Sequence, residues 1–448
     1  MEETNDLDKM KTNSYVFKMS LPIFVELLLQ LLVGNIDQIM VGHYRKMSVA
    51  AIVNGNQIMS IVIIVLNMMS MATTVVLSQF IGARDQEKAN QTCTLSVSII
   101  TFSSFLATLI IFVFRSKIFA AMNVDAEILG ETTGYLLIVA SFIIVQGLYL
   151  NIAAILRSHT FLKQVMYVSV IMNILNVFGN FVLINGWSFF PQLGVAGAAV
   201  STGISKTIGL SLITILLFRK TKIKFRWMYL KKNPFPIFKK IIMIGLPSGL
   251  ESLSYQVSQL FILGMINSFG KVMTITKGYC SILANFSYVY AIAIAQATQI
   301  IVGYLLGARR IDDLTKRVWD TLKIAFICCV GLSTLLYFNS NLIFRIFTDI
   351  PEVFEVGKKL LLIEIFLEFG RAVNIVMTRM LIGVGNVKVP ITVGISGHWI
   401  LACFLSYLFG VVLHWGIQGI WVAMAVDECT RGLIYVITFR RNRWRKNL

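Results

Sequence analysis

The two halves of this 448-residue chain carry the same landmarks at one fixed offset. Leu21-Pro22 returns as Leu246-Pro247, and Gly82-Ala83-Arg84 returns as Gly307-Ala308-Arg309, in each case 225 residues later. Internal repeats of this kind indicate that one structural unit has been duplicated. Whatever fold the first half adopts, the second half is therefore expected to repeat it.

The composition places both copies in a membrane. Hydrophobic residues make up 56% of the chain and charged residues only 14%, and the mean hydropathy is +0.76. These values exclude an ordinary soluble chain of this length. Together with the long apolar runs they predict an all-α integral membrane protein.

Apolar runs bounded by charged residues, Gly or Pro give about twelve spans of the roughly 20 residues that a helix needs to cross the hydrocarbon core. Six spans per repeat is an even number, so the repeats enter the membrane in the same direction. They should be related by a pseudo-two-fold axis along the membrane normal, around a central cavity. The predicted domains are an N-terminal six-helix lobe (1–218), a basic cytoplasmic linker (219–236) and a C-terminal six-helix lobe (237–448). The predicted spans are 15–41, 47–80, 90–114, 128–155, 164–185, 194–218, 237–265, 272–306, 317–340, 354–380, 388–412 and 416–439.

The positive charge of the chain follows its expected topology. Most of the 40 Lys and Arg residues lie in segments that are cytoplasmic if the N-terminus is inside, which is the positive-inside pattern. We expect a multi-pass protein of the cytoplasmic (inner) cell membrane with both termini in the cytoplasm. Two dense basic stretches, 219–240 and 440–446, could bind nucleic acid, but contact with anionic lipid head groups explains both more simply. Membrane lipids are therefore expected partners, and nucleic acid is not.

Ionisable side chains at membrane depth are the main candidates for function, because an uncompensated charge there is costly. In the first span Asp37 follows Glu26 by about three helical turns, so both project from one face. Asn176 and Asn180 lie one turn apart in the fifth span, and Thr202 in the sixth span could join them. Asp37 and these three residues could bind Na⁺. Alternatively, the amides make only interhelical hydrogen bonds and Asp37 only a helix-end hydrogen bond.

A proline precedes a glutamate by four residues in the first span of each repeat. Pro22 precedes Glu26, and Pro247 precedes Glu251. Because proline removes a backbone hydrogen bond, a helix bend is predicted at both places. The two glutamates either support packing near the bend or bind a cation, and Glu251 is included among the predicted cation-coupling residues.

Charged residues also interrupt the tenth and twelfth spans. Opposite charges at membrane depth imply pairing, so we expect both arginines to be neutralised by acids within or between these helices. A structural ion-pair network is one interpretation, and a gate or proton relay is the other. The residues are Glu364, Glu368 and Arg371 in the tenth span, and Asp427, Glu428 and Arg431 in the twelfth.

Duplicated halves with acids inside their spans are the layout of an alternating-access transporter, whose halves rock around a substrate site. The segment 264–272 has the wrong glycine spacing for a phosphate loop, and the four histidines are scattered with no HExxH or GxSxG motif. We therefore expect no enzyme and no cofactor apart from a coupling ion. The alternative is a flippase for lipid-linked oligosaccharides, which would need basic residues facing a pyrophosphate. The first half instead offers acids and amides, with Lys206 as its one deep cation.

The chain resembles the multidrug and toxic compound extrusion (MATE) transporters over nearly its whole length. The resemblance implies two six-helix lobes around a central cavity, export of amphipathic, often cationic small molecules, and inward flow of Na⁺ or H⁺ as the energy source. We also expect a monomer. The matching segments are the end of the first span at 34–42, the end of the second span at 79–83 and the start of the sixth span at 193–199.

The resemblance also carries residue roles and departures from them. In this family the acid matching Asp37 couples cations, and the acid matching Glu251 does so in some members. Asn180 stands where many members have an aspartate, and Glu368 with Arg371 occupies the part of the tenth span where some members have an acid. An oxygen-rich site around Asp37 would suit Na⁺, whereas Asp37 alone would suffice for H⁺. Both ions remain open.

Overall fold

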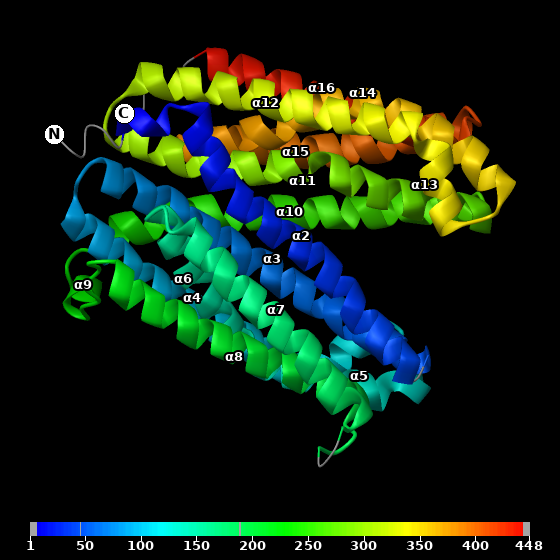
Figure 1. The fold of residues 1–448 in the computed structure, drawn as a ribbon, viewed down its shortest axis with the longest axis horizontal. Coiled ribbons are helices and arrows are strands. Elements are labelled where there is room, and N and C mark those ends of the chain that lie inside the picture. The colour runs from blue at the N-terminus through cyan, green and yellow to red at the C-terminus, as the bar shows by residue number, and fades with distance from the viewer. Residues whose placement is uncertain (1–6, 45, 188–189, 442–448) are drawn as a thin grey trace. The chain divides into compact units, whose positions relative to one another are not determined.

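A computed structural model describes residues 7–44, 46–187 and 190–441, except for the side chains of residues 33–39, 43, 44, 46 and 47. The described residues form helices joined by short connections, and no strand occurs among them (Figure 1). By their internal contacts they divide into two compact units. We call Val25–Gly249 the N-terminal unit, and the residues up to Phe24 together with those from Leu250 onward the C-terminal unit.

The N-terminal unit contains most of the first repeat. In it α7 and α8 lie side by side, and α6 packs against α3, α4 and α8. Its helices are the later part of α2 (Asn13–Tyr44), α3 (Lys46–Gly82), α4 (Gln86–Ala121), α5 (Ala126–Ser141), α6 (Ile143–Ser158), α7 (Leu162–Asn185), α8 (Gly194–Lys220), α9 (Met228–Lys231) and the beginning of α10 (Phe235–Ser268).

The C-terminal unit is organised around α14 (Pro351–Gly383), which packs against three other long helices, α11 (Lys271–Gly307), α12 (Ile311–Phe338) and α16 (Gly416–Arg440) (Figure 1). At Gly370 the α14 backbone approaches Cys429 of α16 so closely that a Cβ atom would clash with the α16 backbone. The other helices of this unit are α13 (Ser340–Phe347), α15 (Lys388–Ser396) and the π-helices η1 (Gly397–Phe404) and η2 (Tyr407–Val412).

The helices agree with the predicted all-α architecture of about twelve spans. In the described part of the chain, eight helical segments are long and apolar enough to cross a membrane, and the bent pair α5–α6 makes a ninth. Three long helices complete the set: α10, which contains Pro247, and α14 and α16, which carry the charged residues of the tenth and twelfth spans. Each predicted span overlaps one of these segments.

The fourth and eleventh spans are less regular than the sequence suggested. The fourth is broken at Phe142, where α5 and α6 meet at 45°. The Phe142 ring lies against Gly203 of α8, where any Cβ atom would clash with it. The eleventh span starts as α15 and then continues as the π-helices η1 and η2, whose wider turns are common at functional sites. The short helices α9 and α13 were not predicted.

The first helix of each repeat contributes to both units. The chain passes from one unit to the other at Phe24–Val25 in α2 and at Gly249–Leu250 in α10. Both places lie directly after the repeat prolines, Pro22 and Pro247. The compact units therefore differ from the lobes expected at 1–218 and 237–448 in two ways: the beginnings of these two helices are exchanged, and the linker 219–236 belongs to the N-terminal unit. The lobe boundaries themselves stay a prediction.

The exchanged helix beginnings are held by specific contacts inside their units. In the C-terminal unit, Tyr290 of α11 meets the Phe24 ring edge-on at 5.6 Å, and its hydroxyl lies 3.4 Å from Ser20 Oγ. In the N-terminal unit, Lys240 Nζ donates to Gln79 Oε1 at 2.8 Å. In each repeat, the start of the first helix therefore belongs to the compact unit that is formed mostly by the other repeat.

Candidate cation-coupling sites

The candidate site in the N-terminal unit is partly assembled. Asn176 Nδ2 on α7 donates to Thr202 Oγ1 on α8 at 3.1 Å. Next to this bond, Ser201 Oγ donates to the backbone carbonyl of Asn176 at 2.9 Å. Asn180 is fully buried one turn further along α7. Asp37 lies in α2, but its side chain is outside the described residues. The structure therefore brings together the amide and hydroxyl of two predicted ligands.

Glu26 has a partner that the sequence analysis did not identify. Arg157, in the last turn of α6, places its Nη2 atom 2.6 Å from Glu26 Oε1, and Glu26 is only 4% exposed. Sequence reasoning missed Arg157 because an arginine at the predicted cytoplasmic end of a span is already explained by the expected topology. The available signal was a buried acid that required a compensating charge.

Glu251, the repeat counterpart of Glu26, has different surroundings. The residue at the repeat position of Arg157 is Ile382. A histidine faces Glu251 instead, and Arg379 and Arg431 also act on this carboxylate electrostatically. His398 Nε2 lies 3.7 Å from Glu251 Oε1. The His398 side chain is buried, and its ring stacks at a tilt against Tyr255 with 5.3 Å between centroids.

Arg371 on α14 forms a cluster with two acids of its own helix. Its Nη1 atom contacts both Glu364 Oε1 and Glu368 Oε1 at 2.5 Å. Two hydrogen bonds from other helices hold the acids: Trp421 Nε1 donates to Glu364 Oε2 at 2.8 Å, and Ser287 Oγ donates to Glu368 Oε1 at 2.9 Å. Both carboxylates are almost completely buried.

Arg431 forms a corresponding cluster on α16. Its Nε and Nη2 atoms donate to the two Asp427 oxygens at 2.9 and 2.7 Å, and Nη2 lies 3.1 Å from Glu428 Oε1. Asn374 of α14 donates to Glu428 Oε2. The expected pairing of both arginines is thus present and lies within each helix, while neutral side chains connect the helices. Whether these charges act as a gate, a relay or a scaffold stays a prediction.

The two arginine clusters share an unusual charge balance. Each guanidinium carries one positive charge and contacts two carboxylates. If every acid is ionised, each cluster retains one excess negative charge at membrane depth. An excess charge of this kind is costly unless a proton or another cation neutralises it.

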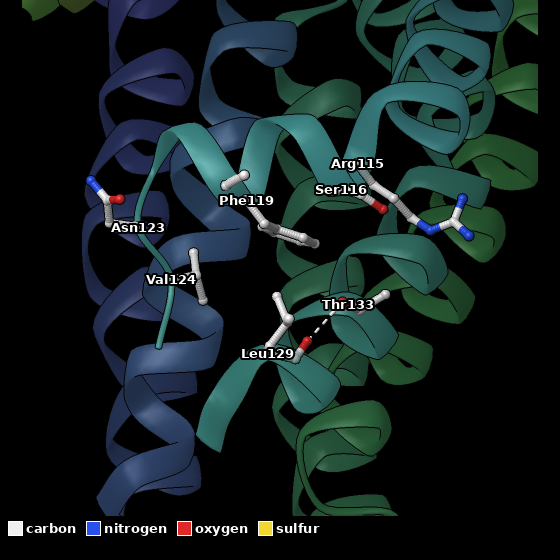
Figure 2. Close-up of a pocket in the computed structure, with 8 residues that line it drawn as sticks. Arg115, Ser116, Phe119, Asn123, Val124, Leu129 and Thr133 are labelled. Atoms are coloured by element: carbon white, nitrogen blue, oxygen red, sulfur yellow. Dashed lines mark hydrogen bonds between the residues drawn. The ribbon is translucent and has the colours of Figure 1, made fainter. Parts of the chain in front are cut away.

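Two cavities among the described residues have no acid in their lining. A cavity of about 350 Å³ lies where α4 ends and α5 begins, and Figure 2 shows the side chains that line it. Its charged member is Arg115, whose Nη1 donates to the Phe112 carbonyl, and no carboxylate faces it. Another cavity, of about 450 Å³, lies between the α15–η1 helix and α16 and reaches Arg431.

Comparison with known proteins identifies the family. The MatE family profile matches residues 22–182 and 247–408. The two matches begin at Pro22 and Pro247, so they reproduce the internal repeat read from the sequence. The chain belongs to the MatE family. Its members are the multidrug and toxic compound extrusion transporters, and the resemblance found in the sequence is confirmed.

Relatives of this MatE chain match it over almost its full length. It is 32% identical over 433 residues to the uncharacterized transporter YisQ of Bacillus subtilis, covering 96% of this chain and 94% of YisQ. It is 25% identical over 434 residues to the probable multidrug resistance protein NorM of Thermotoga maritima, covering 96% and 93% of the two chains. A crystal structure of MATE in the bent conformation has the same fold, with a TM-score of 0.90, 19% identity and 98% coverage of both chains.

Proposed function

We propose that this MatE-family transporter exports amphipathic, often cationic small molecules by alternating access, in exchange for Na⁺ or H⁺ that flows inward. We further propose that it acts as a monomer in the cytoplasmic membrane with both termini inside the cell. The distribution of Lys and Arg supports this orientation. The name of the NorM relative, a probable multidrug resistance protein, is consistent with this class of substrate.

The observation that carries the proposal is that carboxylates outnumber the arginines they contact in the helices of the C-terminal unit. Arg371 and Arg431 each contact two acids, and Glu251 faces a histidine. A site that is charged when empty and neutral when a cation is bound has different energies in the two ion states. Binding and release of the ion can therefore bias two conformations of the protein in opposite directions.

A second candidate for ion binding is the N-terminal cluster of Asp37, Asn176, Asn180 and Thr202. The bond between Asn176 and Thr202 supports it, since it holds one amide and one hydroxyl together. Oxygen atoms from such groups are suitable ligands for a hard cation such as Na⁺. We propose that Asp37 completes this cluster. We also propose that Glu251 is a coupling acid of the C-terminal unit, without assigning it Na⁺.

Transport in proteoliposomes tests the function directly. Vesicles would contain a fluorescent organic cation, and Na⁺ and H⁺ gradients would be imposed separately on the parent protein and on Asp37→Asn. Protein orientation would be measured by protease removal of a C-terminal tag, which we expect to be cytoplasmic. We expect one gradient to drive transport of the dye and Asp37→Asn to abolish the response to that gradient.

A matched control is Asp349→Asn, which removes a carboxylate at an exposed position just before α14. This variant should transport like the parent protein. Transport that persists in Asp37→Asn would move coupling to Glu251 or the tenth-span acids. Correctly folded parent protein that responds to neither gradient would contradict the proposed exchange and favour a flippase.

A further inference from the structure

The two glutamates that follow the repeat prolines occupy equivalent sequence positions but have chemically different partners. Glu26 is paired with Arg157, a permanently charged side chain at 2.6 Å. Glu251 faces His398, which can be neutral or charged. The first acid is therefore fixed in an ion pair, whereas the second faces a group that can exchange a proton.

The backbone around His398 is built to bring this residue close to Glu251. His398 is the second residue of η1, directly after the end of α15. A Cβ atom on Gly394 would lie only 3.0 Å from Glu251 Oε1, and one on Gly397 only 2.6 Å from Asp427 Oδ1. The missing side chains at Gly394 and Gly397 thus let this helix fit between the acid of α10 and the charged cluster of α16.

Among the described residues, one ring nitrogen of His398 has no hydrogen-bond partner and the other faces Glu251. Nδ1 is buried and makes no hydrogen bond with any described residue. Nε2 is the atom that faces Glu251, at 3.7 Å, which is somewhat longer than a direct hydrogen bond. If the distance between His398 Nε2 and Glu251 Oε1 shortened by less than 1 Å, the two atoms could share a hydrogen bond directly. One bridging water could link them in the same way.

The chemistry of this pair favours a proton over Na⁺. Hard cations such as Na⁺ are bound by oxygen ligands, whereas imidazole nitrogen prefers protons and transition metals. Glu251 and His398 contribute one carboxylate and one imidazole, a poor set of ligands for Na⁺. The same two groups can share a proton between an oxygen and a nitrogen.

Other charged or titratable groups also face the pair and set its electrostatic environment. Asp427 and Glu428 both contact Arg431, and the Tyr255 ring lies against the His398 ring with 5.3 Å between centroids. From every element packed around the pair these groups are Tyr255 on α10, Tyr288 on α11, Arg371 and Arg379 on α14, and Asp427, Glu428, Arg431 and Tyr435 on α16.

We propose that Glu251 and His398 together bind the coupling proton and that His398 is the residue that selects H⁺ over Na⁺. This inference rests on the proposed function. In the empty state Glu251 is ionised and His398 is neutral, so the pair carries one negative charge. One proton enters and bonds covalently to a Glu251 oxygen. The resulting O–H group donates a hydrogen bond to His398 Nε2, and the pair becomes neutral. The same proton leaves on the other side of the membrane, and no other reactant is needed.

The first test does not depend on transport. In ¹⁵N-histidine NMR spectra of the full chain in nanodiscs, pH titrations would compare the parent with Glu251→Gln. We expect the midpoint of the His398 signal to move by about one pH unit or more in Glu251→Gln. The His159 signal is the control, since its ring contacts the Ile155 carbonyl, and it should not move. A His398 titration unchanged by Glu251→Gln, or one displaced by added Na⁺, would overturn the proposal.

The second test links the pair to coupling. His398→Gln and His159→Gln would be compared in the proteoliposome assay, together with gradient-free exchange of labelled for unlabelled dye. We expect His398→Gln to lose H⁺-driven transport and its pH dependence while exchange persists, and His159→Gln to retain both. H⁺-driven transport with an unchanged pH profile in His398→Gln would refute the role of His398. Absence of any driven transport in the parent would instead refute the proposed function, and the NMR titration would still decide the proton pair.

Discussion

Single residues decide how each half of the molecule handles buried charge. Glu26 and Glu251 hold the same place in the repeat, yet one meets an arginine and the other a histidine. Arg371 and Arg431 each meet two acids. A buried acid with one permanent partner is suited to structural support, whereas an acid in excess, or one beside a titratable group, is suited to ion exchange.

Removal of Arg157 should destabilise the N-terminal unit, because it leaves the Glu26 carboxylate buried without a counter-charge. We expect Arg157→Met to cost about 3 kcal/mol, seen as a lower midpoint of thermal unfolding in detergent. The double variant Glu26→Met with Arg157→Met should recover much of this loss. Arg115→Met, which removes an arginine that contacts a backbone carbonyl, is the control. Equal melting of Arg157→Met and the parent would argue against a stabilising ion pair.

At the scale of helices, polar contacts at the helix ends fix segments that apolar packing alone would leave free. In the N-terminal unit, Gln91 Nε2 of α4 donates to the carbonyls of Tyr229 and Lys232, at 3.3 and 2.7 Å, and so holds α9. In the C-terminal unit, Asp8 contacts Arg310 at 2.8 Å, and Arg317 donates to the Lys11 carbonyl at 3.0 Å. The second set attaches the segment before α2 to the start of α12.

The contact between Asp8 and α12 should depend on pH. Hydrogen bonds and charge from Lys11 and Arg310 lower the pKa of Asp8 below its ordinary value of 3.8. Because the pKa is lowered, this contact stabilises the attached segment fully when the pH is above the ordinary pKa of 3.8. The stabilisation is lost as the pH falls through the lowered pKa. We expect the mobility of a spin label at Leu7→Cys to rise as the pH falls below about 3.8.

The same label allows two further comparisons. Asp8→Asn should raise label mobility already at neutral pH, and high salt should do the same, because exposed ion pairs are screened. Glu87→Gln removes the exposed partner of Lys232 in the N-terminal unit and should leave the label unchanged. Constant mobility across the acid range would mean that Asp8 does not hold the segment.

At the scale of the whole molecule, the two helices that contribute to both units are the connections through which the units can be coupled. In α2 and α10 the chain changes unit directly after a proline. A proline inside a helix leaves one carbonyl without its usual partner and permits bending there. The repeat therefore places a proline at equivalent points of both connections, and we predict that the helices bend there.

Replacement of these prolines should slow transport without weakening substrate binding. Pro22→Ala and Pro247→Ala restore the missing N–H group and stiffen the helix, so we expect transport rates to fall by about three- to tenfold. Dye binding to the same variants, measured by fluorescence titration, should be unchanged. Pro236→Ala is the control, because Pro236 lies in the first turn of α10, where a missing N–H costs no helical bond. Equal rates in all three variants would exclude a role for bending.

The order of residues along the chain was enough to predict the class of fold. Span lengths, the 225-residue offset and the proline positions can all be taken directly from the order of residues along the chain. The thickness of the hydrocarbon core sets the length of each apolar run, whatever the rest of the chain does. The sequence also marked the charged residues of the tenth and twelfth spans, since opposite charges at membrane depth must find each other.

The partner of each acid and the shape of two of the spans depend instead on how distant segments pack together. Glu26 and Arg157 are separated by 131 residues. They meet because side-chain packing sets how α2 and α6 are rotated about their axes. His398 approaches Glu251 because Gly394 and Gly397 make room and η1 winds as a π-helix. The break at Phe142 likewise depends on the space at Gly203. Contacts of this kind depend on shape between distant segments, and no local pattern in the sequence records them.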